Sequence, residues 1–161
     1  MNIETDRLNL RALTRDEAAA IVAKDRTGMS WADDYPTPGD TTVATSALAG
    51  GHSFATDAMP WGLFTIIEKS SGLSVGGIGF KNSPDVDGAV EIGYGVCQLS
   101  QGRGLATEAV AAMCDFARRD VRCVLAETDR KNVASQRVLE KAGFVRIQES
   151  DETIRWRKET V

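Results

Sequence analysis

The feature that most constrains this chain is a glycine-containing turn, Gln101–Ala106 (QGRGLA), which joins a strand-like segment to an amphipathic helical segment. Residues 89–96 alternate as an extended strand does, and residues 103–119 place apolar side chains at helical spacing. A further apolar, strand-like segment follows at residues 123–127. A strand, a helix and a second strand in this order predict a crossover connection within an α/β fold.

The remaining segments predict strands that follow one another across short turns, as in an antiparallel meander. The expected strands are residues 5–11, 61–69, 73–80, 89–96, 123–127, 144–148 and 153–157. The expected helices are residues 14–24, 41–48, 103–119 and 132–143. The first helix has a clear start signal, because Thr14 and Glu17 have the spacing of a capping box.

A chain of 161 residues has the length of about one domain. We therefore expect a single domain over residues 1–161, with a mostly antiparallel mixed sheet of about seven strands flanked by about four helices.

The charge of the chain argues against nucleic acid and membrane partners. Asp and Glu number 23 against 19 Lys and Arg, so no excess of basic side chains is present to bind phosphate backbones or anionic lipid. No apolar run reaches the roughly 20 residues that cross a bilayer. Residues 1–13 lack the apolar core of a signal peptide, and we expect a cytoplasmic protein.

The cysteines and the histidine exclude several kinds of site. The three cysteines, Cys97, Cys114 and Cys123, have no CxxC spacing, so we expect neither disulfides nor a zinc site but small buried side chains. His52 is the only histidine, which makes a histidine metal site or a Ser-His-Asp triad hard to build. We therefore expect no metal.

Glycines alternate along one side of the strand at residues 89–96. Val90, Ile92, Tyr94 and Val96 share one face and can enter the core, whereas the other face presents Glu91 followed by two glycines. Bare backbone beside a carboxylate forms a trough for a ligand, although glycines at these positions are equally typical of a β-bulge. The strand alone leaves both interpretations open.

The turn at 101–106 favours a ligand. Gly102 and Gly104 leave backbone N–H groups accessible at the start of a helix, where the helix dipole favours phosphate, and Arg103 adds a positive charge. A dinucleotide fingerprint does not fit, because the turn lacks the third Gly or Ala and follows a meander. A Walker A loop does not fit either, since no Gly-Lys-Ser/Thr follows.

Three motifs in order resemble a known family. They are the Q-x-x-G-x-A turn after a Glu-bearing strand, the strand end AETD, and the helix NVASQRVLEKAGF. Together they are similar to the GNAT superfamily of acyl-CoA-dependent N-acetyltransferases, and within it to the Rim-type branch that acetylates ribosomal-protein N-termini. The opening ETDRLNLRAL also resembles the first strand of that branch, so the likeness covers essentially the whole chain.

The resemblance implies acetyl-CoA as co-substrate. It implies that the turn binds the CoA pyrophosphate, that pantetheine pairs with the strand, and that Asn132 contacts the CoA arm. The residues implied for CoA are Tyr94, Gly95, Val96, Gln101, Gly102, Arg103, Gly104, Leu105, Ala106 and Asn132.

The resemblance also implies two catalytic roles, Glu91 as general base and Ser135 as the group that serves the thiolate. Many relatives carry a tyrosine seven residues after the Asn, but this chain has Leu139 there, and the Rim-type branch instead carries a serine at the place of Ser135. Ser135 can also be an ordinary helix serine that bonds back to a carbonyl, but we favour the functional role. A carboxylate with an ordinary pKa is a poor match for an amine, so Glu91 needs desolvation or a bridging water. The N–H near Val96 is a candidate to stabilise the oxyanion.

The acceptor is expected to be a primary amine, either a peptide N-terminus or a small cationic amine. The loops 26–40 and 82–88 are expected to line its side of the fold, and their aspartates suit a cation. The candidate substrate residues are Trp31, Asp33, Asp34 and Tyr35, although the same loop can simply cap the core. The alternative function is an acyl-CoA-binding sensor or interaction module without catalysis. We expect a monomer or homodimer.

Overall fold

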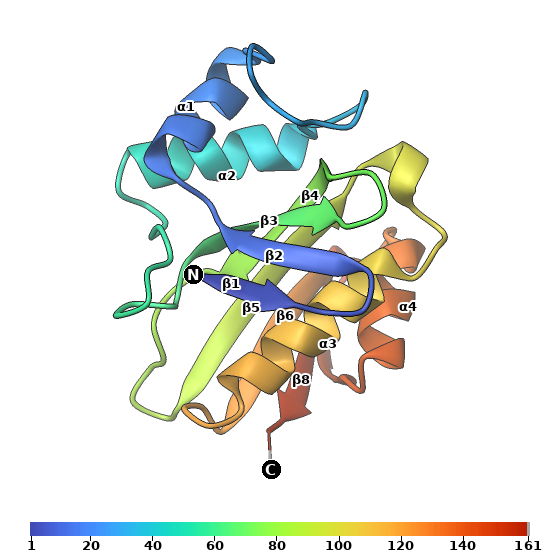
Figure 1. The fold of residues 1–161 in the computed structure, drawn as a ribbon. Coiled ribbons are helices and arrows are strands. Elements are labelled where there is room, and N and C mark those ends of the chain that lie inside the picture. The colour runs from blue at the N-terminus through green and yellow to red at the C-terminus, as the bar shows by residue number, and fades with distance from the viewer. Residues whose placement is uncertain (161) are drawn as a thin grey trace.

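The structure is a computed structural model that describes residues 1–160. Within these residues it contains eight β-strands and four α-helices, which confirms the expected α/β architecture of about seven strands and four helices (Figure 1). The strands are β1 (Asn2–Glu4), β2 (Leu8–Ala12), β3 (Leu63–Glu68), β4 (Leu73–Phe80), β5 (Ala89–Val96), β6 (Cys123–Asp129), β7 (Val145–Glu149) and β8 (Thr153–Glu159). The α-helices are α1 (Arg15–Ala23), α2 (Pro38–Leu48), α3 (Leu105–Ala117) and α4 (Val133–Lys141), and a short 3₁₀ turn spans Gln98–Ser100.

All the strands belong to one sheet, in the order β1-β2-β3-β4-β5-β6-β8-β7. The pair β5–β6 is parallel and the other neighbouring strands are antiparallel. The parallel pair is joined through α3, as the strand–helix–strand pattern predicted, because parallel neighbours need a crossover. No helix described in residues 1–160 is long and apolar enough to span a bilayer.

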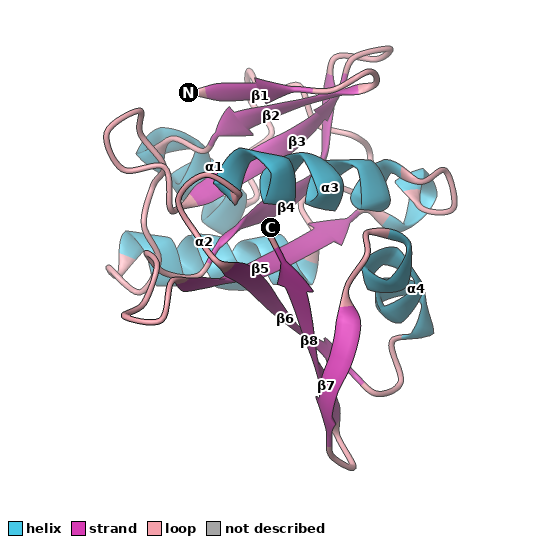
Figure 2. Cartoon of the chain, turned by 90° about the horizontal axis from the view of Figure 1, so that it is seen from below, coloured by secondary structure: helices cyan, strands magenta, loops and turns pink. Residues whose placement is uncertain are grey.

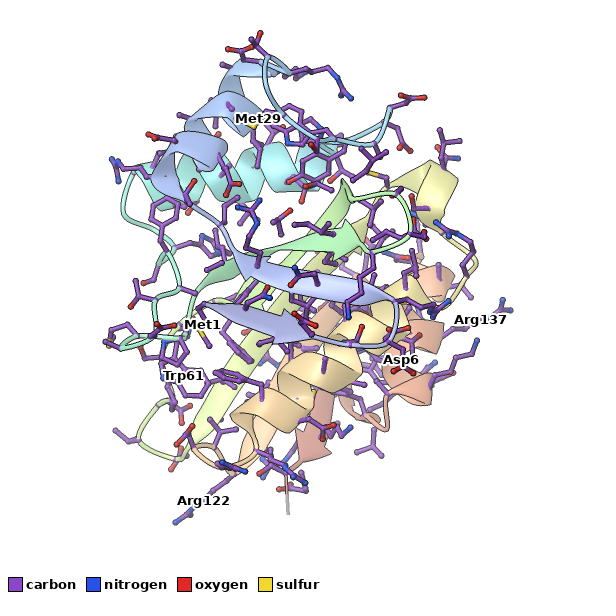
Figure 3. The ribbon with its side chains drawn as sticks, viewed as in Figure 1. Met1, Asp6, Met29, Trp61, Arg122 and Arg137 are labelled. Carbon is purple, nitrogen blue, oxygen red and sulfur yellow. The ribbon has the colours of Figure 1, made fainter. Side chains whose placement is uncertain are left out.

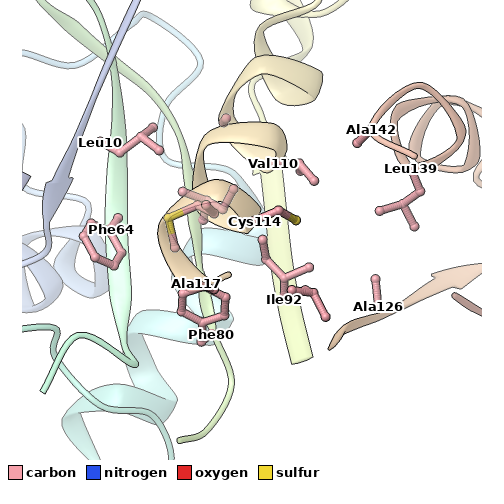
Figure 4. Close-up of a cluster of buried hydrophobic side chains, with 14 of the residues drawn as sticks. Leu10, Phe64, Phe80, Ile92, Val110, Cys114, Ala117, Ala126, Leu139 and Ala142 are labelled. Carbon is pink, nitrogen blue, oxygen red and sulfur yellow. The ribbon is translucent and has the colours of Figure 1, made fainter. Parts of the chain in front are cut away.

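The main core lies between the sheet and the helices α3 and α4. The apolar face of α3 contributes Val110, Met113 and Cys114, which pack against side chains such as Phe64 and Ile92 of the sheet. Figure 4 shows this contact, with Leu139 and Ala142 of α4 lying over Ala126 of β6. Period-two alternation along the strands places these sheet residues on one face.

The opposite face of the sheet is covered by α1 and α2 (Figure 2). A second buried cluster lies there, built from Ile21 of α1, Ala44 and Ala47 of α2, and Trp31 and Tyr35 of the loop between the helices.

The first strand and the start of the second helix differ most from the sequence expectation, whereas the other boundaries agree to within two residues. The first strand is two short strands, because the chain turns at residues 5–7 and pairs Asn2 with Arg11 in a hairpin. The second helix begins at Pro38 rather than Thr41, because Thr37 caps it and Asp40 completes a capping box. The first helix keeps its expected Thr14–Glu17 capping box.

Candidate functional site

The strands β5 and β6 separate shortly after they meet. Their register pairs only Ala89, Val90 and Glu91 with residues 123–125, although β5 continues to Val96 and β6 to Asp129. Backbone groups of β5 beyond Glu91 therefore have no strand partner on that side. We call this gap the β5–β6 opening.

The alternation of the antiparallel ladder identifies which backbone groups face the β5–β6 opening. The N–H of Lys81 donates to Glu91 O and that of Cys97 to Val75 O, so odd-numbered residues of β5 bond to β4. The N–H and C=O groups of Ile92, Tyr94 and Val96 consequently point toward the opening. The side-chain amide of Gln101 donates to Val96 O at 3.0 Å.

The turn before α3 has the backbone geometry that its glycines predict. Gly102 and Gly104 have φ of 80° and 78°, in the left-handed region where a side chain is strained. Gly104 is the N-cap of α3 and provides no side-chain cap, so the first N–H groups of the helix are not capped by a side chain. Such a helix start favours an anion.

Arg103, in contrast, does not extend toward a ligand. Its guanidinium makes a forked ion pair with Glu68 of β3, at 2.5 and 3.0 Å, and this pairing lowers the pKa of the Glu68 carboxyl. Arg7 supports the same turn by donating to Arg103 O at 2.7 Å and pairing with Glu108 of α3 at 2.7 Å. Glu68 therefore largely neutralises the positive charge that we expected Arg103 to offer to a ligand. The Arg103 side chain instead connects the turn to β3.

A pair of hydroxyl groups connects β5 with α4. The Tyr94 hydroxyl lies 2.8 Å from Ser135 Oγ and donates to Ser135 O at 3.1 Å. Burial raises the pKa of Tyr94 to about 12, so its phenol stays protonated near neutral pH. Asn132 is the N-cap of α4, and its side chain accepts from Ser135 N at 3.1 Å. Leu139 of α4 is fully buried in the core.

Glu91 has an ion-pair partner that the sequence pattern did not indicate. Lys81 Nζ lies 2.5 Å from Glu91 Oε1, and both side chains retain contact with solvent. The pair lies on the face of the sheet that α1 and α2 cover, on the same side as Gly93 and Gly95.

A cavity lies on that face, between α2 and the strands β4 and β5. The expected trough along β5 is present, because Gly93 and Gly95 line it. Two glycines of β4, Gly77 and Gly79, lie directly opposite them in the register and line it too. This second pair of glycines was not predicted from the sequence, although the run Gly76-Gly77-Ile78-Gly79 was the available signal.

The candidate substrate residues of the loop 26–40 occupy different environments. Trp31 and Tyr35 are buried and pack edge to face with ring centroids 5.4 Å apart, and Tyr35 also lines the cavity. Asp34 accepts from Leu99 N at 2.9 Å, whereas Asp33 is exposed. The loop therefore caps the second core cluster and contributes one wall of the cavity.

The loop 82–88 does not lie beside this cavity. Gly88 O accepts from Arg122 N at 2.7 Å, at the start of β6. Figure 3 shows Arg122 at the end of the molecule opposite Met29, which lies in the loop after α1. This loop lies at the start of β5, and none of residues 82–88 lines the cavity.

The cysteines behave as packing residues. Cys97, Cys114 and Cys123 are free and buried. Burial, with a smaller contribution from Asp34, raises the pKa of Cys97 to about 12, so its thiol is a poor nucleophile near neutral pH.

Comparison with known proteins identifies a family. Residues 7–145 match the family described as the acetyltransferase (GNAT) domain. The chain is 33% identical over 93 residues to an uncharacterized N-acetyltransferase, YjdG, of Bacillus subtilis. That similarity covers 56% of this chain and 55% of the relative, so it spans about half of either protein.

Solved structures share the fold over nearly the whole chain. A GNAT-family acetyltransferase from Bacillus anthracis superposes with a TM-score of 0.70 at 20% identity, covering 99% of both chains. RimL, a ribosomal L7/L12 α-N-protein acetyltransferase solved in complex with coenzyme A, gives 0.67 at 18% identity, covering 99% of this chain and 98% of that one. At these identities the likeness concerns the fold. The family match covers most of the sequence, and this chain belongs to the GNAT acetyltransferase family.

Proposed function

We propose that this protein transfers an acetyl group from acetyl-CoA to a primary amine, either a peptide N-terminus or a small cationic amine. Family membership supports acetyl transfer, and the β5–β6 opening is the observation in the structure that carries the proposal. Unpaired backbone groups along an open strand edge can bind an extended ligand as an added strand would.

Coenzyme A fits the groups around the opening. Its pyrophosphate would bind the N–H groups of residues 102–106 at the start of α3, because these donors and the helix dipole favour phosphate. Its pantetheine amides would pair with the free edge of β5 at Tyr94 and Val96. Asn132 already caps α4, so we assign it to orienting Ser135 and to the rim of the CoA site.

The chemistry requires an amine nitrogen to attack the thioester carbonyl while the carbon–sulfur bond breaks and the CoA thiolate leaves. Glu91 would accept the proton of the amine, directly or through a water, because an amine attacks only in its neutral form. The Val96 N–H would stabilise the negative charge that develops on the carbonyl oxygen. Ser135, hydrogen-bonded to Tyr94, would donate to the departing sulfur.

Release of free thiol from acetyl-CoA in the presence of a panel of primary amines tests this function. We expect amine-dependent thiol release and a product heavier than the amine by one acetyl group. Binding of acetyl-CoA without turnover on any amine would instead favour a non-catalytic acyl-CoA sensor, for which the replacement of the helix tyrosine by Leu139 is the supporting feature.

A further inference from the structure

Four glycines of two neighbouring strands lie side by side on the α1–α2 face of the sheet. Gly77 of β4 lies opposite Gly95 of β5, and Gly79 lies opposite Gly93. These residues, which we call the glycine floor, line a cavity of about 160 Å³. Gly93 and Gly95 are open on this face, so a ligand can lie directly on β5. Asp40 Oδ1 lies over Gly77, and Gly62 O and Leu63 lie over Gly79.

The walls above the glycine floor are mostly apolar. The apolar lining of the cavity comes from Leu13, from Ile21 of α1, from Val43 and Ala44 of α2 and from Leu63 of β3. An apolar cavity of about 150 Å³ accommodates a benzene-sized molecule in other proteins. The volume therefore suits an apolar body of about six heavy atoms rather than a long chain.

One carboxylate faces this apolar space. Asp40 lines the cavity, and its Oδ2 accepts hydrogen bonds from Thr37 N at 2.9 Å and Thr37 Oγ1 at 2.8 Å. Among residues 1–160, Asp40 Oδ1 receives no hydrogen bond, and it lies 2.6 Å from the point where a β-carbon of Gly77 would be. A side chain at position 77 would occupy this space, so the glycine leaves room for Asp40 Oδ1 above β4.

Two other polar side chains that line the cavity have partners of their own, and a third is neutral. Lys81 pairs with Glu91, and His52 Nδ1 lies 2.8 Å from Ser46 Oγ. Burial raises the pKa of the Tyr35 phenol, and Asp40 nearby raises it further, so Tyr35 is neutral. Burial also raises the pKa of Asp40. A cation that enters would relieve this unfavourable burial of negative charge.

We propose that the acceptor is a compact primary amine with an apolar body, held in this cavity with its ammonium group on Asp40 Oδ1. The inference rests on the proposed acetyl transfer and names its acceptor class. It assigns the binding of the ammonium group to Asp40. Glu91 does not line this cavity, so it would receive the proton of the amine through water rather than directly. The strand β5 borders both sites, since Gly93 and Gly95 face the cavity while the backbone of Tyr94 faces the β5–β6 opening, so the two ligands would meet beside this strand.

A series of amines tests the acceptor class. We compare methylamine, butylamine, benzylamine and 2-phenylethylamine with spermidine and with a tripeptide that has a free N-terminal amine. The measurement is kcat/KM at saturating acetyl-CoA. We expect kcat/KM to rise by about ten-fold for each methylene that the cavity buries, and benzylamine to exceed spermidine. Preference for spermidine or for the tripeptide would overturn the compact, apolar class.

A matched pair of variants tests Asp40. Asp40→Asn removes the charge but keeps an oxygen that can accept from Thr37 N, so the helix cap is retained. We expect the KM for benzylamine to rise roughly 10–100-fold, as for loss of a hydrogen bond to a charged group, with an unchanged Kd for acetyl-CoA. Glu17→Gln alters the equivalent capping box of α1 and is expected to leave the KM for benzylamine within about two-fold. An unchanged KM in Asp40→Asn would overturn the assignment.

A cavity-filling variant provides an independent check. No atom lies within 4 Å of a β-carbon built at Gly95, so Gly95→Val introduces a side chain without a clash. We expect an unchanged melting temperature and a loss of kcat/KM that is at least ten-fold larger for 2-phenylethylamine than for methylamine. An equal loss for both amines would contradict binding in this cavity. Failure of acetyl-CoA to bind the unmodified protein would instead contradict the proposed function itself.

Discussion

The Glu91 carboxylate is held only weakly by its ion-pair partner. Glu91 is paired with Lys81, but their side chains are 22% and 43% exposed, so solvent screens the pair. Exposed ion pairs are worth about 0–1 kcal/mol, and Lys81 can therefore release Glu91 at little cost when a substrate binds. This makes the proposed proton acceptor compatible with its observed partner.

Replacement of Glu91 separates a role in proton transfer from a structural role. We expect Glu91→Gln to keep its affinity for acetyl-CoA and to lower kcat/KM by roughly 10²–10⁴-fold at neutral pH. The deficit should shrink as pH rises above the pKa of the amine, because the substrate then arrives neutral. A kcat/KM profile from pH 6 to 10 measures this. A deficit that is constant with pH, together with a lower melting temperature, would indicate a structural carboxylate.

The hydrogen bond between Tyr94 and Ser135 leads to a second prediction, which concerns the effect of two single substitutions and of their combination on kcat. We expect Tyr94→Phe and Ser135→Ala each to lower kcat, by roughly 10-fold, because each removes one partner of the hydrogen bond at the opening. The double variant should lose little more than either single variant, since groups that act as a unit are not additive. Thiol-release kinetics of the four proteins measure the coupling, and fully additive losses would mean that the hydroxyls act separately.

At the scale of elements, the start of α3 is held in place from the first strands of the sheet. Arg7 bonds to Arg103 O and to Glu108, and Arg103 pairs with Glu68 of β3. The turn can therefore present its N–H groups in a fixed arrangement before any ligand arrives, which reduces the entropy that binding must overcome.

Backbone and side chain of this turn are expected to contribute unequally to CoA binding. Gly104→Val forces a β-branched residue into a left-handed conformation at the N-cap, so we expect CoA affinity to fall by more than ten-fold. Arg103→Ala leaves the backbone donors in place and should change the Kd only a few-fold. Titration calorimetry with CoA compares the two variants. Equal losses would show that the arginine side chain dominates.

The Glu68–Arg103 pair predicts a pH dependence of stability. Because Arg103 lowers the folded-state pKa of Glu68, its contribution to stability is present above the unfolded pKa, near the model-peptide value of about 4.3. That contribution is lost as pH falls through the lower folded pKa. Glu68→Gln should therefore reduce the melting temperature at pH 7, and the difference from the unmodified protein should narrow below about pH 4. A difference that widens on acidification would contradict this assignment.

At the scale of the whole molecule, the sheet separates two compartments. The helices α3 and α4 cover the face with the main core, whereas α1 and α2 cover the other face (Figures 1 and 2). The cavity lies on that other face, and the β5–β6 opening lies at the edge of β5. β5 belongs to both compartments. An acyl donor in the opening and an amine in the cavity would thus meet at one strand.

Acetyl-CoA should stabilise the folded protein as a whole. At about 100 times its Kd, a ligand adds roughly 2.7 kcal/mol to the free energy of unfolding. For a domain of this size the melting temperature should rise by about 5–10 °C, which differential scanning fluorimetry measures. Gly104→Val should show a much smaller rise at the same concentration. An unchanged melting temperature at millimolar acetyl-CoA would contradict the CoA site.

The sequence alone determined the elements and the main motifs, because these depend on local spacing. The alternation in β5, the capping box of α1 and the amphipathic face of α3 each involve residues a few positions apart, and all three are present. The family followed from motifs of the same kind, and the family match confirms it. The start of α2 was missed because the prolines around Thr37 and Asp40 obscured an equally local capping box.

The tertiary structure decided which residues meet across the chain. Position 77 faces position 95 only once β4 and β5 pair in register, and Asp40 reaches the glycine floor only because α2 packs over it. Glu91 acquires Lys81, Arg103 acquires Glu68, and the Tyr94 hydroxyl reaches Ser135 through contacts 10, 35 and 41 residues apart. Such contacts arise from strand register and helix packing, which no local pattern contains, and they determine which side chains remain available to a substrate.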